Sequence, residues 1–470
     1  MFIINALIAF ATWFWGVPIL LLCGIGGIIL TISTGFIQFR HFAYICSQTF
    51  GKMFAKSSGD GTVSPFSAAC TALASTIGAS NIVGVPVAIA LGGSGAVFWV
   101  VLMAIIGCGT KFVEVTAGIM FREKNADGEF VGGPFYYCRH IGKKGTLLGK
   151  IGAVVGSFYA FMLMIELIPS LAAQATSAAQ QGTAMHINHT VIAILTAAVV
   201  TIVVIGGVKR IADVCDKLVP LMAVVYLVGA IIIIIMHAQN IPTAIKDVFE
   251  NAFTGEAAMG GFAGAGLAQA IRWGTARGVY SNEAGFGTAP IGHAAAIVDH
   301  PVRQGFWGVF EVVVDTLVVC VTTALVILTT GVYKVEGIES GALAQRAFHE
   351  GFGTFGDFFV GISVFLFVLS TIIACAFYGR RQAEFLFGVT FGKVWVWIYI
   401  IATIIGGFGY DLGVMYSLTD AFLGMVIIPN MITLFFLIPQ VRVAVHEFFH
   451  TPDKYYLADM AAKQAKKAAK

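Results

Sequence analysis

The chain has 470 residues, of which 58% are hydrophobic and 11% are charged, and its formal net charge is +3. A soluble domain carries about 25% charged residues, so this composition leaves too little polar surface for a water-soluble globule. The mean hydropathy of +0.87 and unbroken apolar runs such as 219–236 favour a bilayer as the solvent. Barrel strands would alternate apolar and polar residues, so the sequence predicts an all-α polytopic membrane protein.

Hydropathy predicts about eleven transmembrane helices. Their expected bounds are 14–36, 66–92, 94–120, 150–178, 189–208, 216–238, 258–297 (interrupted), 305–330, 356–378, 392–409 and 412–438. Of the 28 Lys and Arg residues, 22 lie in one set of alternate loops and the tail, three in the opposite loops, and three within helices. Basic loops stay in the cytoplasm. We therefore expect a multi-pass protein of the plasma (bacterial inner) membrane, with the N-terminus outside and the C-terminus cytoplasmic.

Eleven helices divide into one peripheral helix and two sets of five. Because five is odd, the two sets must have opposite orientations in the membrane, which is the inverted-repeat plan of many secondary transporters. The expected divisions are a peripheral first span with its cytoplasmic loop over 1–65, repeats over 66–238 and 258–438, and a cytoplasmic tail over 439–470.

In that plan the first helix of each repeat is discontinuous and the substrate binds at the two breaks. Residues 76–86 and 278–290 each place glycine, hydroxyl and Asn side chains in mid-span, followed by a proline. Glycine and proline weaken a helix and free backbone groups. The exposed helix N-terminus favours a carboxylate, and exposed carbonyls favour a cation. An amino acid with Na⁺ meets both needs, although small residues also occur at ordinary helix contacts.

Polar residues within the bilayer are costly unless they are paired or functional. Gln174 lies in the fourth span, and Ser370 and Thr371 lie in the ninth. Glu311 and Asp315 lie one turn apart in the eighth span, where a structural network and a proton relay are both open. The sequence has no metal-spaced His/Cys/Asp cluster, no Walker A loop and no nucleophile with a base. We therefore expect no enzyme, no cofactor apart from a coupling ion, and no nucleic-acid partner, with the oligomeric state undetermined.

Several motifs resemble those of a known transporter family. They are Thr71–Gly78, Ala88–Trp99, Val131–Pro134, Gly261–Gly264, Gln269–Arg272, Ala276–Gly285, Asp299–Gly305 and Leu369–Ile372. Over nearly the whole chain, from about residue 20 to 440, the sequence is similar to the alanine or glycine:cation symporters, the sodium:alanine symporter family. This resemblance implies a LeuT-type core of five plus five helices with two broken helices, coupling to Na⁺ or H⁺, and substrates such as alanine and glycine.

The sequence departs from the family pattern at three positions. The usual Gly-Thr-Gly-Asn of the first break is replaced by Gly78-Ala79-Ser80-Asn81. A Trp in the ninth span is replaced by Cys375, and a Glu that follows it is replaced by Arg380. The change from Trp to Cys removes a large side chain from an expected pocket wall. This favours a substrate larger than alanine, unless Tyr280, Trp273 or Phe377 moves in and restores a small pocket.

The sequence as a whole predicts sodium-coupled symport of a small or medium neutral amino acid by alternating access. The expected substrate-binding residues are Gly78, Ser80, Asn81, Gln174, Tyr280, Ser281, Asn282, Gly285 and Cys375. The expected Na⁺ ligands are the carbonyls of Ala74 and Ile77 and the hydroxyls of Ser370 and Thr371, since hydroxyl and carbonyl oxygens suit a hard cation. The alternatives are proton coupling through Glu283 or Asp315, and a channel-like pore.

Overall fold

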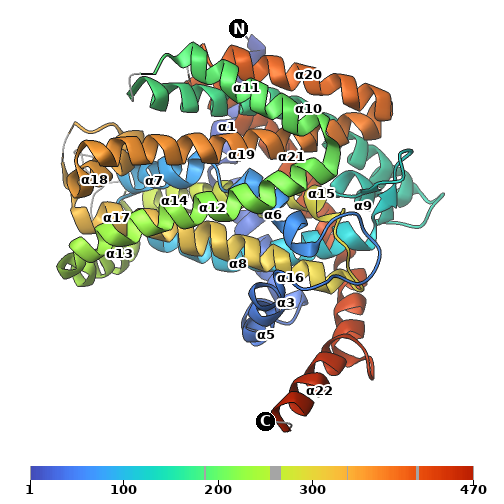
Figure 1. Cartoon of the computed structure of the whole chain (residues 1–470). Helices are drawn as coiled ribbons and strands as arrows, with labels where there is room; N and C mark the ends of the chain where they lie inside the picture. The colour runs from blue at the N-terminus through green and yellow to red at the C-terminus, as the bar shows by residue number, and fades with distance from the viewer. Residues whose placement is uncertain (1, 185–186, 255–265, 336, 409–411, 469–470) are drawn as a thin grey trace.

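The computed structural model describes residues 2–184, 187–254, 266–335, 337–408 and 412–468, and these are mostly helical (Figure 1). Three parts of the sequence predictions lie outside the described residues. They are the first residues of the expected seventh span and second repeat, 258–265, the motif residues Gly261–Gly264, and residue 409 at the end of the expected tenth span.

The helices follow one another along the whole chain. They are α1 (Phe2–Phe14), α2 (Val17–Ile19), α3 (Gly26–Ser33), α4 (Ile37–Arg40), α5 (Phe42–Gln48), α6 (Pro65–Thr76), α7 (Val85–Gly92), α8 (Ala96–Met120), α9 (Pro134–Tyr137), α10 (Leu147–Ala184), α11 (His189–Ile205), α12 (Gly207–Met236), α13 (Ile241–Thr254), α14 (Gly266–Asn282), α15 (Ala289–His293), α16 (Pro301–Val312), α17 (Val321–Thr330), α18 (Leu343–Phe352), α19 (Thr354–Phe387), α20 (Val389–Gly406), α21 (Leu412–His450) and α22 (Tyr455–Ala468). Between them lie the π-helical segments η1 (Leu20–Ile25), η3 (Ser80–Gly84) and η6 (Val313–Cys320), and the short 3₁₀ turns η2 (Phe50–Lys52), η4 (Cys138–His140), η5 (Ala238–Asn240), η7 (Val332–Lys334) and η8 (Ser340–Ala342).

The chain is a multi-pass membrane protein, as its composition predicted. The described residues contain seven helices long and apolar enough to cross a membrane, or up to nine if two bent pairs each count as one crossing. The bent pairs are Asn5–Phe14 with Val17–Ser33, at 47°, and Pro65–Thr76 with Ser80–Gly92, at 48°. Two of the eleven expected spans fall outside this count, because α11 is a shorter apolar helix and the seventh span is divided between α14 and α15.

The long helices run side by side across the bundle (Figure 1). The helices α10, α11 and α20 lie together at the top of the view, α12 and α19 cross the middle, and α8 and α16 lie below them. The first helix, α1, packs against α21 at the periphery. The C-terminal helix α22 extends away from the bundle at the lower right.

Local chemistry sets the start of α6, which carries the first break. Pro65 occupies the first turn, where its missing N–H costs nothing, and the Ser64 side chain accepts a hydrogen bond from Ser67 N at 3.0 Å. Eleven of the twelve residues of α6 are then buried, and small side chains allow this close packing. The helix is therefore held in the centre of the bundle.

One part of the fold departs from the all-α prediction. The strands β1 (Glu123–Lys124) and β2 (Phe130–Val131) form a short antiparallel hairpin in the loop after α8. The Asn125 carboxamide oxygen accepts hydrogen bonds from the N–H groups of Asp127 and Glu129, at 3.1 and 2.9 Å, and so closes the turn.

Candidate functional site

The first break begins where Ile77 leaves the helical conformation, with φ −78° and ψ 84°. The last regular helical bond of α6 runs from Ile77 N to Leu73 O at 2.8 Å. Gly78 N donates to the Asn81 side-chain oxygen at 2.9 Å and to Thr76 O at 3.0 Å. The Ala74 carbonyl consequently lies beyond the regular helical ladder, as the prediction of a broken helix requires.

The second break separates α14 from α15. Within it Glu283, Gly285 and Gly287 adopt left-handed conformations, with φ values of 52°, 100° and 76°. Glycine adopts this conformation freely, whereas Glu283 has a Cβ and must be held there by its surroundings. Its carboxylate accepts a hydrogen bond from the Thr288 hydroxyl and another from the Ser75 hydroxyl at 3.4 Å. The second predicted interruption is therefore present, and its carboxylate contacts the first broken helix.

A buried carboxylate on η6 joins the two breaks. Asp315 is completely buried and accepts hydrogen bonds from Asn81 Nδ2 at 2.6 Å and Ser281 Oγ at 2.8 Å. The Thr316 hydroxyl adds a third bond at 2.6 Å. Asn81 belongs to the first break and Ser281 to the end of α14, so Asp315 fixes one relative to the other.

A second buried carboxylate, on α8, holds the second break against α21. Glu114 Oε1 accepts hydrogen bonds from the backbone N–H groups of Gly285 and Gly287, at 3.1 and 3.0 Å. Asn430 Nδ2 donates to the same oxygen at 2.7 Å and to Gly285 O at 2.8 Å. The backbone N–H groups of Gly285 and Gly287 and the carbonyl of Gly285 thus find partners within the bundle, as the bilayer interior demands.

Between the breaks lies a cavity, which we call the central cavity. Its volume is 40 Å³, which is room for a few water molecules. It is lined by Ser75, Thr76, Gly78, Ser80, Leu163, Glu166, Leu167, Ser170, Gln174, Tyr280, Glu283, Phe286, Thr288, Thr371, Cys375, Tyr378 and Leu423. Both breaks, α10, α19 and α21 therefore contribute to its wall.

The predicted substrate residues fall into two groups. Those that line the central cavity are Gly78, Ser80, Gln174, Tyr280 and Cys375. Those that lie behind its wall are Asn81, Ser281, Asn282 and Gly285, which take part in the hydrogen bonds that hold the breaks or, for Asn282, accept from Ala284 N at 2.9 Å. Sequence position alone does not separate the two groups, because the Asp315 and Glu114 partners come from distant helices.

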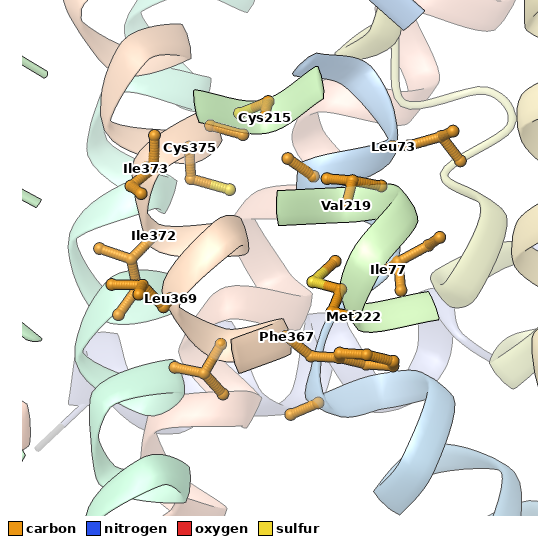
Figure 2. Close-up of a cluster of buried hydrophobic side chains, with 14 of the residues drawn as sticks. Leu73, Ile77, Cys215, Val219, Met222, Phe367, Leu369, Ile372, Ile373 and Cys375 are labelled. Carbon is orange, nitrogen blue, oxygen red and sulfur yellow. The ribbon is translucent and has the colours of Figure 1, made fainter. Parts of the chain in front are cut away.

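The four predicted cation ligands lie on facing elements. Ala74, Ile77 and Ser370 are fully buried, whereas Thr371 lines the central cavity. A Cβ added to Gly78 would lie 2.7 Å from Thr371 Oγ1, so α19 approaches the first break closely there. Ser370 Oγ donates to Phe367 O at 2.8 Å and lies 3.5 Å from the Met222 sulfur. Figure 2 shows Met222 of α12 in the apolar cluster formed with α6 and α19.

Gln174 has an unsatisfied oxygen. Its side chain is 8% exposed, and Oε1 is buried without a hydrogen-bond partner among the described residues. A buried polar atom without a partner is costly. An acceptor in this state on a cavity wall suits a ligand that carries a hydrogen-bond donor.

The sequence prediction missed several residues of the wall. Glu166 and Ser170 share a face of α10 with Gln174, at intervals of four residues. This helical spacing was the available signal, because residues four apart lie on one side of a helix. Ser75, Glu283, Thr288 and Tyr378 also line the cavity without having been predicted as substrate ligands.

The departure at position 380 belongs to a different site. Arg380 Nε pairs with Glu384 at 2.7 Å, and Arg381 pairs with Glu384 at 2.6 Å and with Glu129 at 2.7 Å. These side chains join the C-terminal end of α19 to the β-hairpin loop. Arg380 therefore takes part in an ion-pair network outside the wall of the central cavity.

Comparison with known proteins places the sequence of this chain in a family. The profile of the sodium:alanine symporter family matches residues 1–461. The chain belongs to the sodium:alanine symporter family. An uncharacterised transporter of Bacillus subtilis (strain 168), YflA, is 45% identical over 95% of this chain and 94% of its own length.

Two further relatives of this symporter have names that state a substrate. The sodium/alanine symporter AgcS of Methanococcus maripaludis is 35% identical over 90% of this chain and 92% of its own length. The probable sodium/glutamine symporter GlnT of Bacillus subtilis (strain 168) is 34% identical over 84% of this chain and 80% of its own length. The family resemblance predicted from the motifs is confirmed, and the chain is a sodium-symporter-family transporter rather than an enzyme.

Proposed function

We propose that this symporter carries a small or medium neutral amino acid together with Na⁺ by alternating access. The observation that carries the proposal is the central cavity, which is lined by both helix breaks and by Gln174, whose side-chain oxygen has no partner among the residues described. Relatives named for alanine and for glutamine support a neutral amino acid as the substrate class. In this proposal the protein lies in the bacterial inner membrane with its N-terminus outside and its C-terminus in the cytoplasm.

The substrate contacts follow from the charges of the cavity wall. The carboxylate of the amino acid meets the break at Gly78 and Ser80, where backbone N–H groups at a helix start favour an anion. The ammonium group donates to Gln174 Oε1, which has no partner among the described residues, and faces the carboxylates of Glu166 and Glu283. Tyr280 and Cys375 then border the side chain of the substrate.

Sodium binds between the first break and α19 in this proposal. The Ala74 carbonyl lies outside the helical ladder, and the Ile77 carbonyl follows where the chain leaves the helix. The hydroxyls of Ser370 and Thr371 approach from α19, with Thr371 close to Gly78. Four neutral oxygens of this kind suit a hard monovalent cation, and the ion also offsets the substrate carboxylate nearby.

The helix contacts support eleven crossings arranged as two inverted repeats, over 66–238 and 258–438. The second helices of the two repeats, α8 and α16, pack together, as do the third helices α10 and α19 and the fourth helices α11 and α20. The third helix of each repeat also packs on the fifth helix of the other, because α10 contacts α21 and α19 contacts α12. Contacts that survive the exchange of the two repeats are expected around a pseudo-two-fold axis.

Proton coupling is the second candidate. Asp315 accepts hydrogen bonds from both breaks, and Glu283 lines the central cavity, so a proton on either carboxylate would change how the breaks are held. A relative is named as a putative sodium/proton-dependent alanine carrier protein. A channel-like pore receives no such support, since the central cavity is small and enclosed by bulky side chains.

Uptake into proteoliposomes tests the proposal. Radiolabelled L-alanine and L-glutamine are supplied outside, with an inward Na⁺ gradient, an inward H⁺ gradient or neither. We expect saturable uptake that the Na⁺ gradient drives above equilibrium. Accumulation driven by the H⁺ gradient alone would favour the proton mechanism, and flux that does not saturate would favour a pore.

A further inference from the structure

A second cavity shares Tyr280 with the central cavity. We call it the Arg277 cavity; its volume is 180 Å³, and it lies between α1, α14 and α21. The Tyr280 ring packs against the rings of Trp15, at 5.8 Å, and Phe286, at 6.4 Å. Because Tyr280 lines both spaces, it separates a larger cavity at the periphery from the narrow one between the breaks.

The positively charged side chain of Arg277 is held by aromatic rings. The Arg277 guanidinium lies 5.6 Å from the ring centre of Trp273 and 5.7 Å from that of Tyr280. Its Nε is buried without a hydrogen-bond partner, and no ion pair joins it to a carboxylate of the described residues. Stacking leaves the N–H groups of an arginine unsatisfied, although they fit a carboxylate in a bidentate geometry. The site therefore has a free donor group for an anion.

A carboxylate lies across the same cavity. Asp420 of α21 lines it and interacts electrostatically with Arg277. The backbone position of Asp420 is fixed by the peripheral segment, because Trp15 Nε1 donates to Asp420 O at 3.0 Å. The cavity thus presents two arginines, Arg272 and Arg277, and one carboxylate, Asp420. Among the described residues no ion pair joins Arg277 to Asp420. Opposite charges that face a small, partly desolvated space are costly when they are left uncompensated.

We propose that the Arg277 cavity is a second binding site for a free zwitterionic amino acid, with the ligand carboxylate on Arg277 and its ammonium group on Asp420. This inference rests on the proposed function, since the ligand is the amino acid that later reaches the central cavity. A zwitterion satisfies the charges of Arg277 and Asp420 at once, and the volume of 180 Å³ exceeds the 40 Å³ of the central cavity. Tyr280 is then the barrier that the ligand passes between the two sites.

Equilibrium binding of radiolabelled L-alanine to the purified full chain tests this site, with L-glutamine in a parallel assay. We expect wild type to bind two molecules per chain at saturation and Gln174→Leu to bind one. Adding Arg277→Gln or Asp420→Asn to Gln174→Leu removes the remaining binding. L-Alaninamide, which lacks the carboxylate, should not displace label from Gln174→Leu. Arg346→Gln is the matched control, because Arg346 pairs only with Glu350 on the exposed surface of α18.

The outcomes separate this inference from the proposed function. The second site does not exist if Gln174→Leu binds no amino acid, or if adding Arg277→Gln to Gln174→Leu leaves the binding unchanged. This holds whatever the uptake assay shows. If Gln174→Leu keeps an Arg277-dependent site while wild type shows no gradient-driven uptake, the transport proposal fails and the site stands. In the uptake assay, the single variant Arg277→Gln is expected to raise the half-saturating substrate concentration roughly tenfold. This factor corresponds to the loss of one charge-assisted hydrogen bond.

Discussion

At the scale of single residues, Gln174 makes the sharpest prediction. Its amide oxygen is buried on the wall of the central cavity and has no partner in the part of the chain that the structure describes, and Leu has a similar size without the acceptor. We expect Gln174→Leu to abolish amino-acid uptake while the protein still inserts and purifies as the wild type does. Gln180→Leu is the control, because Gln180 is exposed on the same helix. Wild-type uptake by Gln174→Leu would reduce this residue to a packing role.

Cys375 makes a prediction about selectivity. It lines the central cavity where related symporters are expected to carry a Trp, and a Trp side chain buries up to about 250 Å². We expect Cys375→Trp to shift preference toward alanine and glycine, because the added ring occupies space that a larger side chain needs. A competition panel of unlabelled amino acids measures the shift, with Cys375→Ser as the control for loss of the thiol. If alanine and glycine already outcompete all larger amino acids in the wild type, the prediction of a larger pocket is wrong.

At the scale of elements, the contact of α19 with the first break makes a prediction about coupling. Ser370 and Thr371 are adjacent hydroxyls on α19, and Thr371 lies against Gly78. We expect the double change Ser370→Ala/Thr371→Ala to raise the Na⁺ concentration for half-maximal uptake by about tenfold or more, because two oxygen ligands are lost. The measurement is the initial uptake rate as a function of Na⁺ concentration.

The matched control uses another pair of adjacent hydroxyls. Thr329 and Thr330 on α17 bond to the backbone carbonyls of Leu325 and Val326, both at 2.7 Å, as membrane hydroxyls commonly do. Thr329→Ala/Thr330→Ala should leave the Na⁺ dependence unchanged. An unchanged Na⁺ dependence in the Ser370/Thr371 variant as well would place the ion elsewhere.

The two interruptions were the elements that the sequence predicted best. Glycine, hydroxyl and Asn residues before a proline are a local signal, and both 76–86 and 278–290 carry it in mid-span. The hairpin of β1 and β2 gave only a short turn signal around Asn125 and was not predicted. The π-helical segment at Val313–Cys320 also escaped prediction, because its extra residue per turn depends on packing against the breaks and not on a composition of its own.

At the scale of the whole molecule, the sequence predicted that polar residues gather at the two breaks but not how they are arranged. It singled out Asn81 and Ser281 as ligands but did not predict that both donate to Asp315, a residue more than thirty positions from either along the chain. The position of Asp315 follows from how η6 packs against two broken helices, and no local pattern encodes such a contact. Glu166 and Ser170 were missed for a different reason. The predicted Gln174 already marked the face of α10 toward the cavity, but the spacing of four residues was not followed along that face.

The helices α8 and α16 are joined by a buried ion pair, on which the last prediction rests. Lys111 on α8 and Glu311 on α16 lie 3.0 Å apart and are almost completely buried, with exposures of 0% and 1%. Removing one partner of a buried pair costs about 3–5 kcal/mol, because the other charge is left uncompensated, whereas removing both charges is often neutral. We therefore expect Lys111→Met to lower the thermal stability of the purified protein sharply.

The double variant decides whether this loss reflects the stranded charge. In Lys111→Met/Glu311→Gln neither charge of this pair remains, and the Gln oxygen can still accept from His293, which lies 3.3 Å from Glu311. We expect this variant to regain most of the lost Tm in a detergent melting assay. Lys393→Met removes a half-exposed pair with Asp127 and should cost less than about 1 kcal/mol. If the double variant melts no higher than Lys111→Met, then packing of the Lys111 side chain between α8 and α16, and not its charge, holds these two helices together.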